Sequence, residues 1–208
     1  MSKRLAEVES ALERHGLLLE HDKVLPSVTL IVAGEPIAGS WWGHPLGHQI
    51  YELIGRFEHG AGALSAKIIN GKETYVHARL WPAFLSIAQA RPEARLAGLS
   101  RPAAELYASV QKHGPLRADS ERVPRALAST SGELSKAIRA LTGRLLLHTD
   151  SLHTESGAHV KVLSTWAQWC SEHQVRVPAL EPAEAKAALD AALAELCRGS
   201  GLAPKVPW

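Results

Sequence analysis

The chain has 208 residues, of which 46% are apolar and 21% charged, so it can bury a core and is not a disordered tail. Two cysteines are too few for a disulfide scaffold or a four-cysteine zinc site, and a net charge of +2 does not by itself indicate a polyanionic partner. The sequence has no apolar run near the ~18 residues of a membrane span, and its first ten residues do not resemble a secretory signal. We expect a soluble, cytoplasmic protein.

The N-terminal half alternates helical and extended patterns. Apolar residues spaced three and four apart predict helices, and a β-branched apolar run predicts a strand. In chain order the expected elements are a helix over residues 3–15, a strand over 27–33, a helix over 46–58 and a helix over 81–90.

A β-hairpin is expected between the last two of these helices. Asn70-Gly71 separates the β-like runs 64–69 and 72–77, and this dipeptide favours a type I′ turn because both central residues need positive φ. The resulting register pairs Ile68 with Glu73, Ala66 with Tyr75 and Leu64 with His77.

Residues 91–101 form a charged connector, so we expect one domain over residues 1–95 and a second over 96–208. The second half begins with a helix over 102–113 and a short helix within 119–129. A capping box of Thr130 and Glu133 then opens a helix with Leu134, Ile138 and Leu141 on its inner side. Strands over 144–153 and 158–163 flank a turn, and helices begin near Trp166 and at Glu181-Pro182.

This order of elements predicts an α+β, mostly helical fold whose C-terminal half is a winged helix-turn-helix. The N-terminal half repeats part of the scheme, so tandem winged helices are a further hypothesis. In such domains the third helix enters the DNA major groove and cations beside it contact phosphates. The expected contacts lie on the capped helix and the wing: Ser135, Lys136, Arg139, Arg144, His153, His159 and Lys161. The alternatives are a solvated polar face and a protein-binding surface.

Residues 102–169 resemble a known family. The run SKAIRALTGRLLLH, the TESG turn and WAQW are similar to winged-helix segments of the bacterial crosslink-repair DNA glycosylases of the AlkZ/YcaQ type, which are built of tandem winged helices. The resemblance implies DNA binding or a repair context. The family's catalytic signature is Gln-x-Gln or Gln-x-Asp, and no glutamine of this chain has such a neighbour: Gln49, Gln89, Gln111, Gln168 and Gln174. The resemblance therefore does not extend to glycosylase activity.

The segment Trp41-Trp42-Gly43-His44 is the most unusual local feature. Adjacent residues of an extended segment point to opposite sides, so one ring can be buried while the other is exposed and stacks on a base. We favour the alternative that both rings seal the junction between the two halves, since large aromatic side chains usually belong to a core. Trp41, Trp42, His44 and His48 would line the pocket if the protein were an enzyme.

Motifs of catalysis are absent from the sequence. It contains no H-E-x-x-H, C-x-x-C, G-x-S-x-G or P-loop, so we expect no cofactor and no metal, including at the His44 and His48 pair. The function we predict is binding of double-stranded DNA without catalysis, as a bacterial regulator or repair-associated factor. The alternatives are a glycosylase-like DNA-acting enzyme and a protein-interaction module. We expect no membrane association, and a homodimer stays open.

Overall fold

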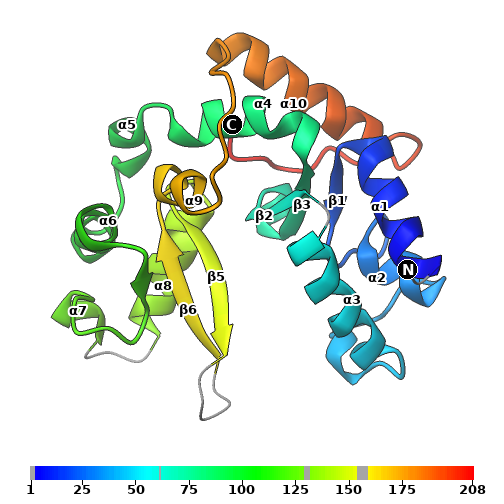
Figure 1. The fold of residues 1–208 in the computed structure, drawn as a ribbon, viewed down its shortest axis with the longest axis horizontal. Helices are drawn as coiled ribbons and strands as arrows, with labels where there is room; N and C mark the ends of the chain where they lie inside the picture. Colours follow the sequence, from blue (N-terminus) through cyan, green and yellow to red (C-terminus); the bar gives the residue numbers. More distant parts are fainter. Residues whose placement is uncertain (1–2, 61, 129–131, 154–158) are drawn as a thin grey trace. The chain divides into compact units, whose positions relative to one another are not determined.

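The computed structural model describes residues 3–60, 62–128, 132–153 and 159–208, and in these ranges the chain is mostly helical with two small antiparallel sheets (Figure 1). The predicted α+β fold class is confirmed. The chain divides into two compact units, one of residues 1–87 with 179–206 and 208, the other of residues 88–178 with 207. No helix of the described ranges has the length and apolar character to cross a bilayer. The domains expected over residues 1–95 and 96–208 stay a prediction.

The first unit contains a three-stranded sheet and its helices. Its elements are α1 (Lys3–His15), β1 (Leu17–Leu19), α2 (Val28–Ala33), the 3-10 turn η1 (Trp41–Gly43), α3 (Gly47–Gly60), β2 (Ala63–Lys67), η2 (Ile69–Gly71), β3 (Glu73–His77), η3 (Ala78–Leu80), most of α4 (Trp81–Gln89) and α10 (Pro182–Leu196). The strand order is β1-β3-β2, with both neighbours of β3 antiparallel to it.

The core of this unit joins α1, α2 and α3 to the sheet. Val8 and Leu12 of α1 are buried together with Ile50 and Phe57 of α3, and Phe57 meets Tyr75 of β3 edge to face at 4.8 Å between ring centroids. These residues are on the apolar stripes that predict the helices over 3–15 and 46–58, and both predictions are confirmed.

The predicted strand over 27–33 is wrong, because Val28–Ala33 is helix α2. Ser27 caps it by accepting a hydrogen bond from the Leu30 backbone N–H, and Gly34 ends it at a φ of 78°. The buried positions Val28, Thr29 and Val32 have helical spacing. Packing of this face outweighs the β preference of its branched residues.

The turn at Asn70-Gly71 is confirmed, but the predicted register is wrong by one residue. Both residues have positive φ, 53° and 69°, and the Lys72 N–H donates to the Ile69 carbonyl. The observed pairs place Lys67 opposite Glu73, Ala66 opposite Thr74 and Leu64 opposite Val76. The Ile68 N–H also bonds to the Lys72 carbonyl, and Ile68 has αR backbone angles, so Ile68 and Ile69 form a β-bulge opposite Lys72. This bulge lets two successive isoleucines be buried.

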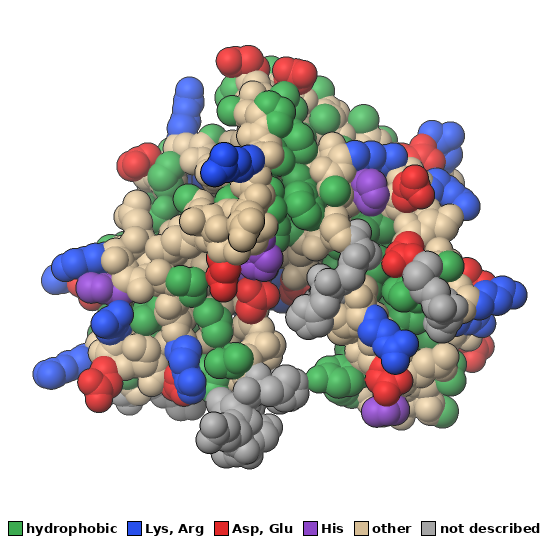
Figure 2. All heavy atoms as spheres, in the orientation of Figure 1, with side chains coloured by type: hydrophobic (Ala, Val, Ile, Leu, Met, Phe, Trp, Pro, Cys, Tyr) green, Lys and Arg blue, Asp and Glu red, His purple; other side chains and the backbone are tan. Residues whose placement is uncertain are grey.

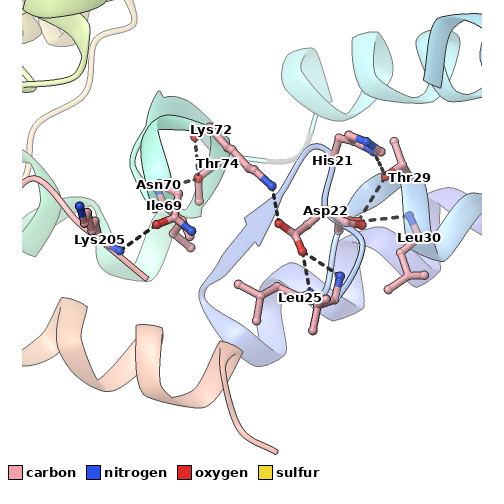
Figure 3. A network of polar contacts seen from close by, with 12 residues as sticks. His21, Asp22, Leu25, Thr29, Leu30, Ile69, Asn70, Lys72, Thr74 and Lys205 are labelled. Carbon is pink, nitrogen blue, oxygen red and sulfur yellow. Dashed lines mark hydrogen bonds and ion pairs between the residues drawn. The ribbon is translucent and has the colours of Figure 1, made fainter. Parts of the chain in front are cut away.

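A polar network ties this hairpin to two distant segments of the chain (Figure 3). Lys72 Nζ lies 2.7 Å from Asp22 Oδ2, while Asp22 Oδ1 accepts from the backbone N–H groups of Val24 and Leu25. On the other side, the Asn70 N–H donates to the Lys205 carbonyl at 2.8 Å and Asn70 Oδ1 accepts from the Lys205 N–H at 2.9 Å. The loop after β1 is therefore bound to the hairpin by an ion pair, and the C-terminal tail is bound to it by two hydrogen bonds.

The second unit has a sheet of its own. Its elements are α5 (Pro92–Leu96), α6 (Arg101–His113), β4 (Leu116–Arg117), α7 (Arg125–Ala128), α8 (Glu133–Thr142), β5 (His148–His153), β6 (His159–Ser164) and α9 (Trp166–Glu172). The strand order is β4-β6-β5, again antiparallel. Its core packs Leu106 and Val110 of α6 against Ile138 and Leu141 of α8 and Leu163 of β6.

Most elements predicted for the second unit are confirmed, with shifted ends. Ser100 caps the helix predicted over 102–113, and the first strand of the predicted hairpin begins at His148 rather than at residue 144. Residues 143–147 instead connect α8 to this strand, and Leu145 among them has a φ of 53°. Helix α8 begins at Glu133 after Gly132, and Thr130 of the predicted capping box lies outside the described residues.

Both units repeat one order of elements. Apart from 3-10 turns, each runs helix, strand, helix, helix, strand, strand, as α1-β1-α2-α3-β2-β3 and as α6-β4-α7-α8-β5-β6. In each sheet the last strand lies between the first and the second. The helices α3 and α8 therefore occupy the same position in the two units, directly before the hairpin.

Candidate nucleic-acid interface

Helix α8 presents a polar face because its apolar residues are used in the core. Ala137, Ile138 and Leu141 are buried, and Leu134 packs partly buried against them, as the sequence predicts. Thr142 is buried too, but its hydroxyl donates to the Ile138 carbonyl at 3.0 Å. The remaining side of the helix exposes three of the predicted contacts: Ser135, Lys136 and Arg139.

The charges on this face are only partly compensated. Lys136 Nζ lies 2.6 Å from Glu133 Oε1, one turn earlier, and the lysine side chain is 73% exposed. Such exposed pairs contribute about 0–1 kcal/mol, so a phosphate can replace the carboxylate at little cost. Arg139 is exposed on the next turn.

Arg144 has a different environment from the one expected. Its Nη1 donates to the backbone carbonyls of Arg95 and Ala97, both at 2.7 Å. In return, Arg95 donates from Nη1 to the carbonyls of Arg144 and Leu145, and from Nη2 to those of Ala88 and Ala90. Arg144 thus bonds to carbonyls at the end of α5, and Arg95 bonds to carbonyls that follow α8 and to carbonyls at the end of α4. This use of its guanidinium makes Arg144 the least available of the predicted phosphate contacts.

The hairpin β5–β6 carries the other predicted contacts. Lys161 is exposed and pairs with Ser151, and its carbonyl accepts from the Ala118 N–H at 2.8 Å. His153 and His159 are backbone partners at the end of the described ladder, and residues 154–158 between them lie outside the described residues. The hairpin and α8 belong to the same unit, so the structure brings Lys136, Arg139 and Lys161 into one unit.

The adjacent tryptophans Trp41 and Trp42 differ sharply in exposure. Trp41 is 6% exposed, and its indole N–H donates to Glu20 Oε1 at 3.2 Å, whereas Trp42 is 62% exposed. The rings stack with centroids 4.3 Å apart and planes 19° apart, and Tyr51 of α3 lies 5.3 Å from Trp42. Trp41 is part of the core of the first unit and Trp42 is not, and a role of both rings at the junction of the two halves stays a prediction.

The two histidines after this stack have local partners. His44 Nδ1 accepts from the Leu46 N–H at 3.2 Å, and His48 Nε2 lies 3.4 Å from Glu52 Oε1 with its side chain 84% exposed. Among the described residues, no three His, Cys, Asp or Glu side chains are grouped as a metal site requires. What the structure shows at Trp41, Trp42, His44 and His48 is an aromatic stack at the start of a helix.

The sequence does not single out Glu20 or Tyr51. Burial raises the pKa of Glu20, and Glu73 nearby adds to the rise, while the hydrogen bond from Trp41 opposes it. Glu20 therefore fixes the buried ring of the stack, Trp41, through a hydrogen bond. Tyr51 of α3 adds a third ring beside Trp42. Tyr51 lies off the apolar stripe of its helix, which is the only sequence signal that it is exposed.

A cavity of about 550 Å³ lies in the first unit between the ends of α1 and α10. Arg14, His15, Glu195 and Arg198 are among its lining residues, and Arg198 pairs with Glu195. Burial lowers the pKa of His15, and Arg14 lowers it further. His15 Nδ1 is buried and has no hydrogen-bond partner among the described residues. The lowered pKa favours the neutral form of His15 in this concave site, which is lined by two arginines and a glutamate.

The surface charge is mixed rather than strongly basic. Figure 2 shows lysine and arginine side chains dispersed among acidic ones over the face in view. This agrees with the net charge of +2. A nucleic-acid interface on this protein would therefore depend on local groups of cations rather than on a general positive field.

Comparison with known proteins gives one result. A family model described as "AlkZ related" matches residues 3–203, while no curated protein and no solved structure matches. The match spans both units with their repeated order of elements. A relation to AlkZ indicates a DNA-acting or DNA-repair-associated function. Because the match covers nearly the whole sequence, the chain belongs to the AlkZ-related family.

Proposed function

We propose that this protein binds double-stranded DNA through two winged-helix units, as a repair-associated or regulatory factor of the bacterial cytoplasm. The observation that carries the proposal is the repeated order of elements with the last strand in the middle of each sheet. A winged helix has this helix–strand–helix–helix–hairpin order. In such domains the third helix enters the major groove and the hairpin contacts the flanking backbone.

In the second unit, α8 is the recognition helix of this proposal and β5–β6 is the wing. In this proposal Arg139 reaches a base edge, and Lys136 and Lys161 contact phosphates; their exposure supports these roles. Ser135, His153 and His159 are secondary contacts. Arg144 stays in the set, but contact with a phosphate would compete with its two backbone carbonyls.

The test is the salt dependence of duplex binding. Each phosphate contact adds about 0.9 to the slope of log affinity against log salt, so Lys136→Gln with Lys161→Gln should flatten the slope by roughly 2. The matched control is Lys23→Gln with Lys112→Gln, which removes the same charge from two exposed positions elsewhere. The control should leave the slope unchanged. Arg139→Ala should weaken one DNA sequence more than others.

Two results would overturn the proposal. One is the absence of salt-sensitive binding to any duplex. The other is an equal flattening of the slope by the control pair, because that would reflect net charge rather than an interface. Light scattering of the free and bound protein measures whether it forms a homodimer, which the sequence leaves open, since two units in one chain can occupy two DNA segments without dimerisation.

The second candidate function is a DNA-acting enzyme, and the cavity at His15 is the observation that favours it. Burial lowers the pKa of His15, which favours the neutral imidazole at pH 7, and a neutral imidazole can accept a proton. Incubation with alkylated duplex, followed by alkaline cleavage at abasic sites, tests for glycosylase-like activity. Strand cleavage that His15→Ala abolishes would establish this function, and absence of cleavage at high enzyme concentration would exclude it for that substrate.

A further inference from the structure

Trp42 has the largest exposed fraction of the large apolar side chains that the structure describes, 62%. One face of its ring is covered by Trp41, whose nearly parallel ring lies 4.3 Å away between centroids. A ring that is stacked on one side and still mostly exposed must present its other face to solvent. The described structure thus contains an open, flat aromatic surface backed by a second indole.

The backbone holds this surface in place. Ser40 Oγ accepts from the Trp42 N–H, the His44 N–H donates to the Trp41 carbonyl, and the Gly47 N–H donates to the His44 carbonyl at 2.7 Å. A Cβ at Gly47 would lie 2.9 Å from the carbonyl oxygens of both tryptophans, so only glycine allows α3 to begin this close to η1. Trp41 is fixed in turn by Glu20. A prearranged ring loses little freedom when it binds a ligand.

The surroundings of the ring are polar rather than apolar. Tyr51, tilted by 41°, extends the aromatic surface along α3, and the exposed residues of the same helix are both acidic and basic: His48, Gln49, Glu52 and Arg56, with His48 paired with Glu52. A large protein interface usually centres on a wider apolar area. An exposed aromatic ring on a polar surface is instead suited to stacking on a nucleobase, because every base has a π-face.

We propose that Trp42, extended by Tyr51, stacks an unpaired nucleobase of bound DNA. The inference rests on the proposed DNA binding, in which α3 has the same place in the first unit as α8 has in the second. It adds a substrate class to that function, DNA with an unpaired base. In an intact duplex both faces of a base are covered by its neighbours. Trp42 can therefore stack only on a base that has left the helix or that lies in a single-stranded gap.

The experiment compares a fully paired duplex with one that carries a single unpaired 2-aminopurine. The wild-type protein should bind the second DNA about tenfold more tightly, and stacking on the indole should quench the 2-aminopurine emission. Trp42→Ala should lose both the preference and the quenching while it retains its affinity and salt slope on paired duplex. Trp42→Phe, which keeps a smaller ring, should retain part of both. Val24→Ala removes a side chain that is 58% exposed elsewhere in the unit, and it should behave as wild type.

The outcomes separate this inference from the function it rests on. If no duplex binds in a salt-dependent way, the proposed function fails and the stacking site with it. If paired duplex binds normally but Trp42→Ala retains the preference for the unpaired base, the stacking site alone is wrong. If Trp42→Ala instead abolishes self-association of the free protein and leaves all DNA binding unchanged, the ring is a protein contact and the inference is likewise wrong. Thermal melting of each variant checks that it is folded.

Discussion

The two units share an order of elements but differ in what they expose around the third helix. In the first unit, α3 follows an aromatic stack whose outer ring is open to solvent. In the second, α8 follows Gly132 and exposes Lys136 and Arg139. The cores are built alike, from apolar stripes of the first and third helices and the middle strand. The same fold can therefore present different side chains at its surface, since exposed residues do not take part in core packing.

The comparison assumes that each unit has a core of its own, which Phe57→Ala tests most strongly. Phe57 is fully buried against Tyr75, so its removal should cost about 3–5 kcal/mol. Hydrogen exchange should show lost protection in α1, α3 and β3, with α6 and α8 still protected. Leu141→Ala should give the reverse pattern. Simultaneous loss of protection in both units under either variant would mean that they unfold as one.

The reciprocal arginines of the second unit predict the next largest effect. Arg95→Ala leaves four backbone carbonyls without their donor, and we expect a loss of about 2–3 kcal/mol in denaturant unfolding. Arg95→Lys should recover only part of it, because an ammonium lacks the planar fork. Arg101→Ala is the control, since Arg101 is 90% exposed and should change stability by less than about 0.5 kcal/mol. An equal loss of stability for Arg95→Ala and Arg101→Ala would show that the hydrogen bonds of Arg95 do not stabilise the protein.

Two glycines with positive φ predict a smaller effect. Gly71 in the first hairpin and Gly132 before α8 have φ of 69° and 88°, and a Cβ added at either position would meet no other atom within 4 Å. The cost of Gly71→Ala or Gly132→Ala is therefore backbone strain alone, about 1 kcal/mol, and Gly71→Val should cost more. Gly55→Ala, within helix α3 and equally unobstructed, should instead stabilise the protein by roughly 0.5–1 kcal/mol. A neutral Gly71→Ala would contradict the type I′ turn.

The smallest expected effects are changes in stability with pH. They have opposite signs at Asp22 and Glu20, because the pKa of Asp22 is lowered and that of Glu20 is raised. Burial would raise the pKa of Asp22, but hydrogen bonds from Lys72, Leu25 and Val24 lower it overall. Ionised Asp22 therefore adds stability at neutral pH, and this is lost as the pH falls through the lowered pKa. The destabilisation by Asp22→Asn should shrink in acid.

Glu20 should show the reverse. Its pKa is raised by burial and by Glu73, so its contribution is present below its ordinary pKa and is lost as the pH rises through the raised one. Glu20→Gln, which can still accept from Trp41, should make the protein more stable than wild type at neutral pH and equal to it in acid. Denaturant midpoints from pH 3 to 8 measure both trends. The same sign for the two variants would contradict the assigned environments.

The sequence predicts the long elements of both units and misses the same short ones. Strands β1 and β4 have three residues and two residues, too few for a hydrophobic period to be detected. The branched run of α2 has strand propensity, and only its caps, Ser27 and Gly34, indicate a helix. These omissions hide the common order of elements. The sequence therefore indicates only part of the repeat, and the full common order becomes visible when tertiary pairing shows which strands are neighbours.

The candidate site could be predicted where it follows helical periodicity and not where it depends on distant contacts. The outward positions of Ser135, Lys136 and Arg139 follow from the buried stripe of α8. The partners of Arg144 are 47 and 49 residues away in the chain, and Glu20 meets Trp41 across 21 residues. Residue spacing contains no information about such contacts. The shift in the hairpin register has a similar origin, because the bulge at Ile68 is favoured by burial of both isoleucines.

The bond between the C-terminal tail and the first hairpin has a consequence for synthesis on the ribosome. The first unit needs α10 and the segment up to residue 206, while the second unit lies within the contiguous stretch 88–178 and the isolated residue 207. Translation proceeds from the N-terminus, so nearly all of the second unit has been made before α10 and Lys205 emerge. The half of the protein that is translated first is thus the last to be completed.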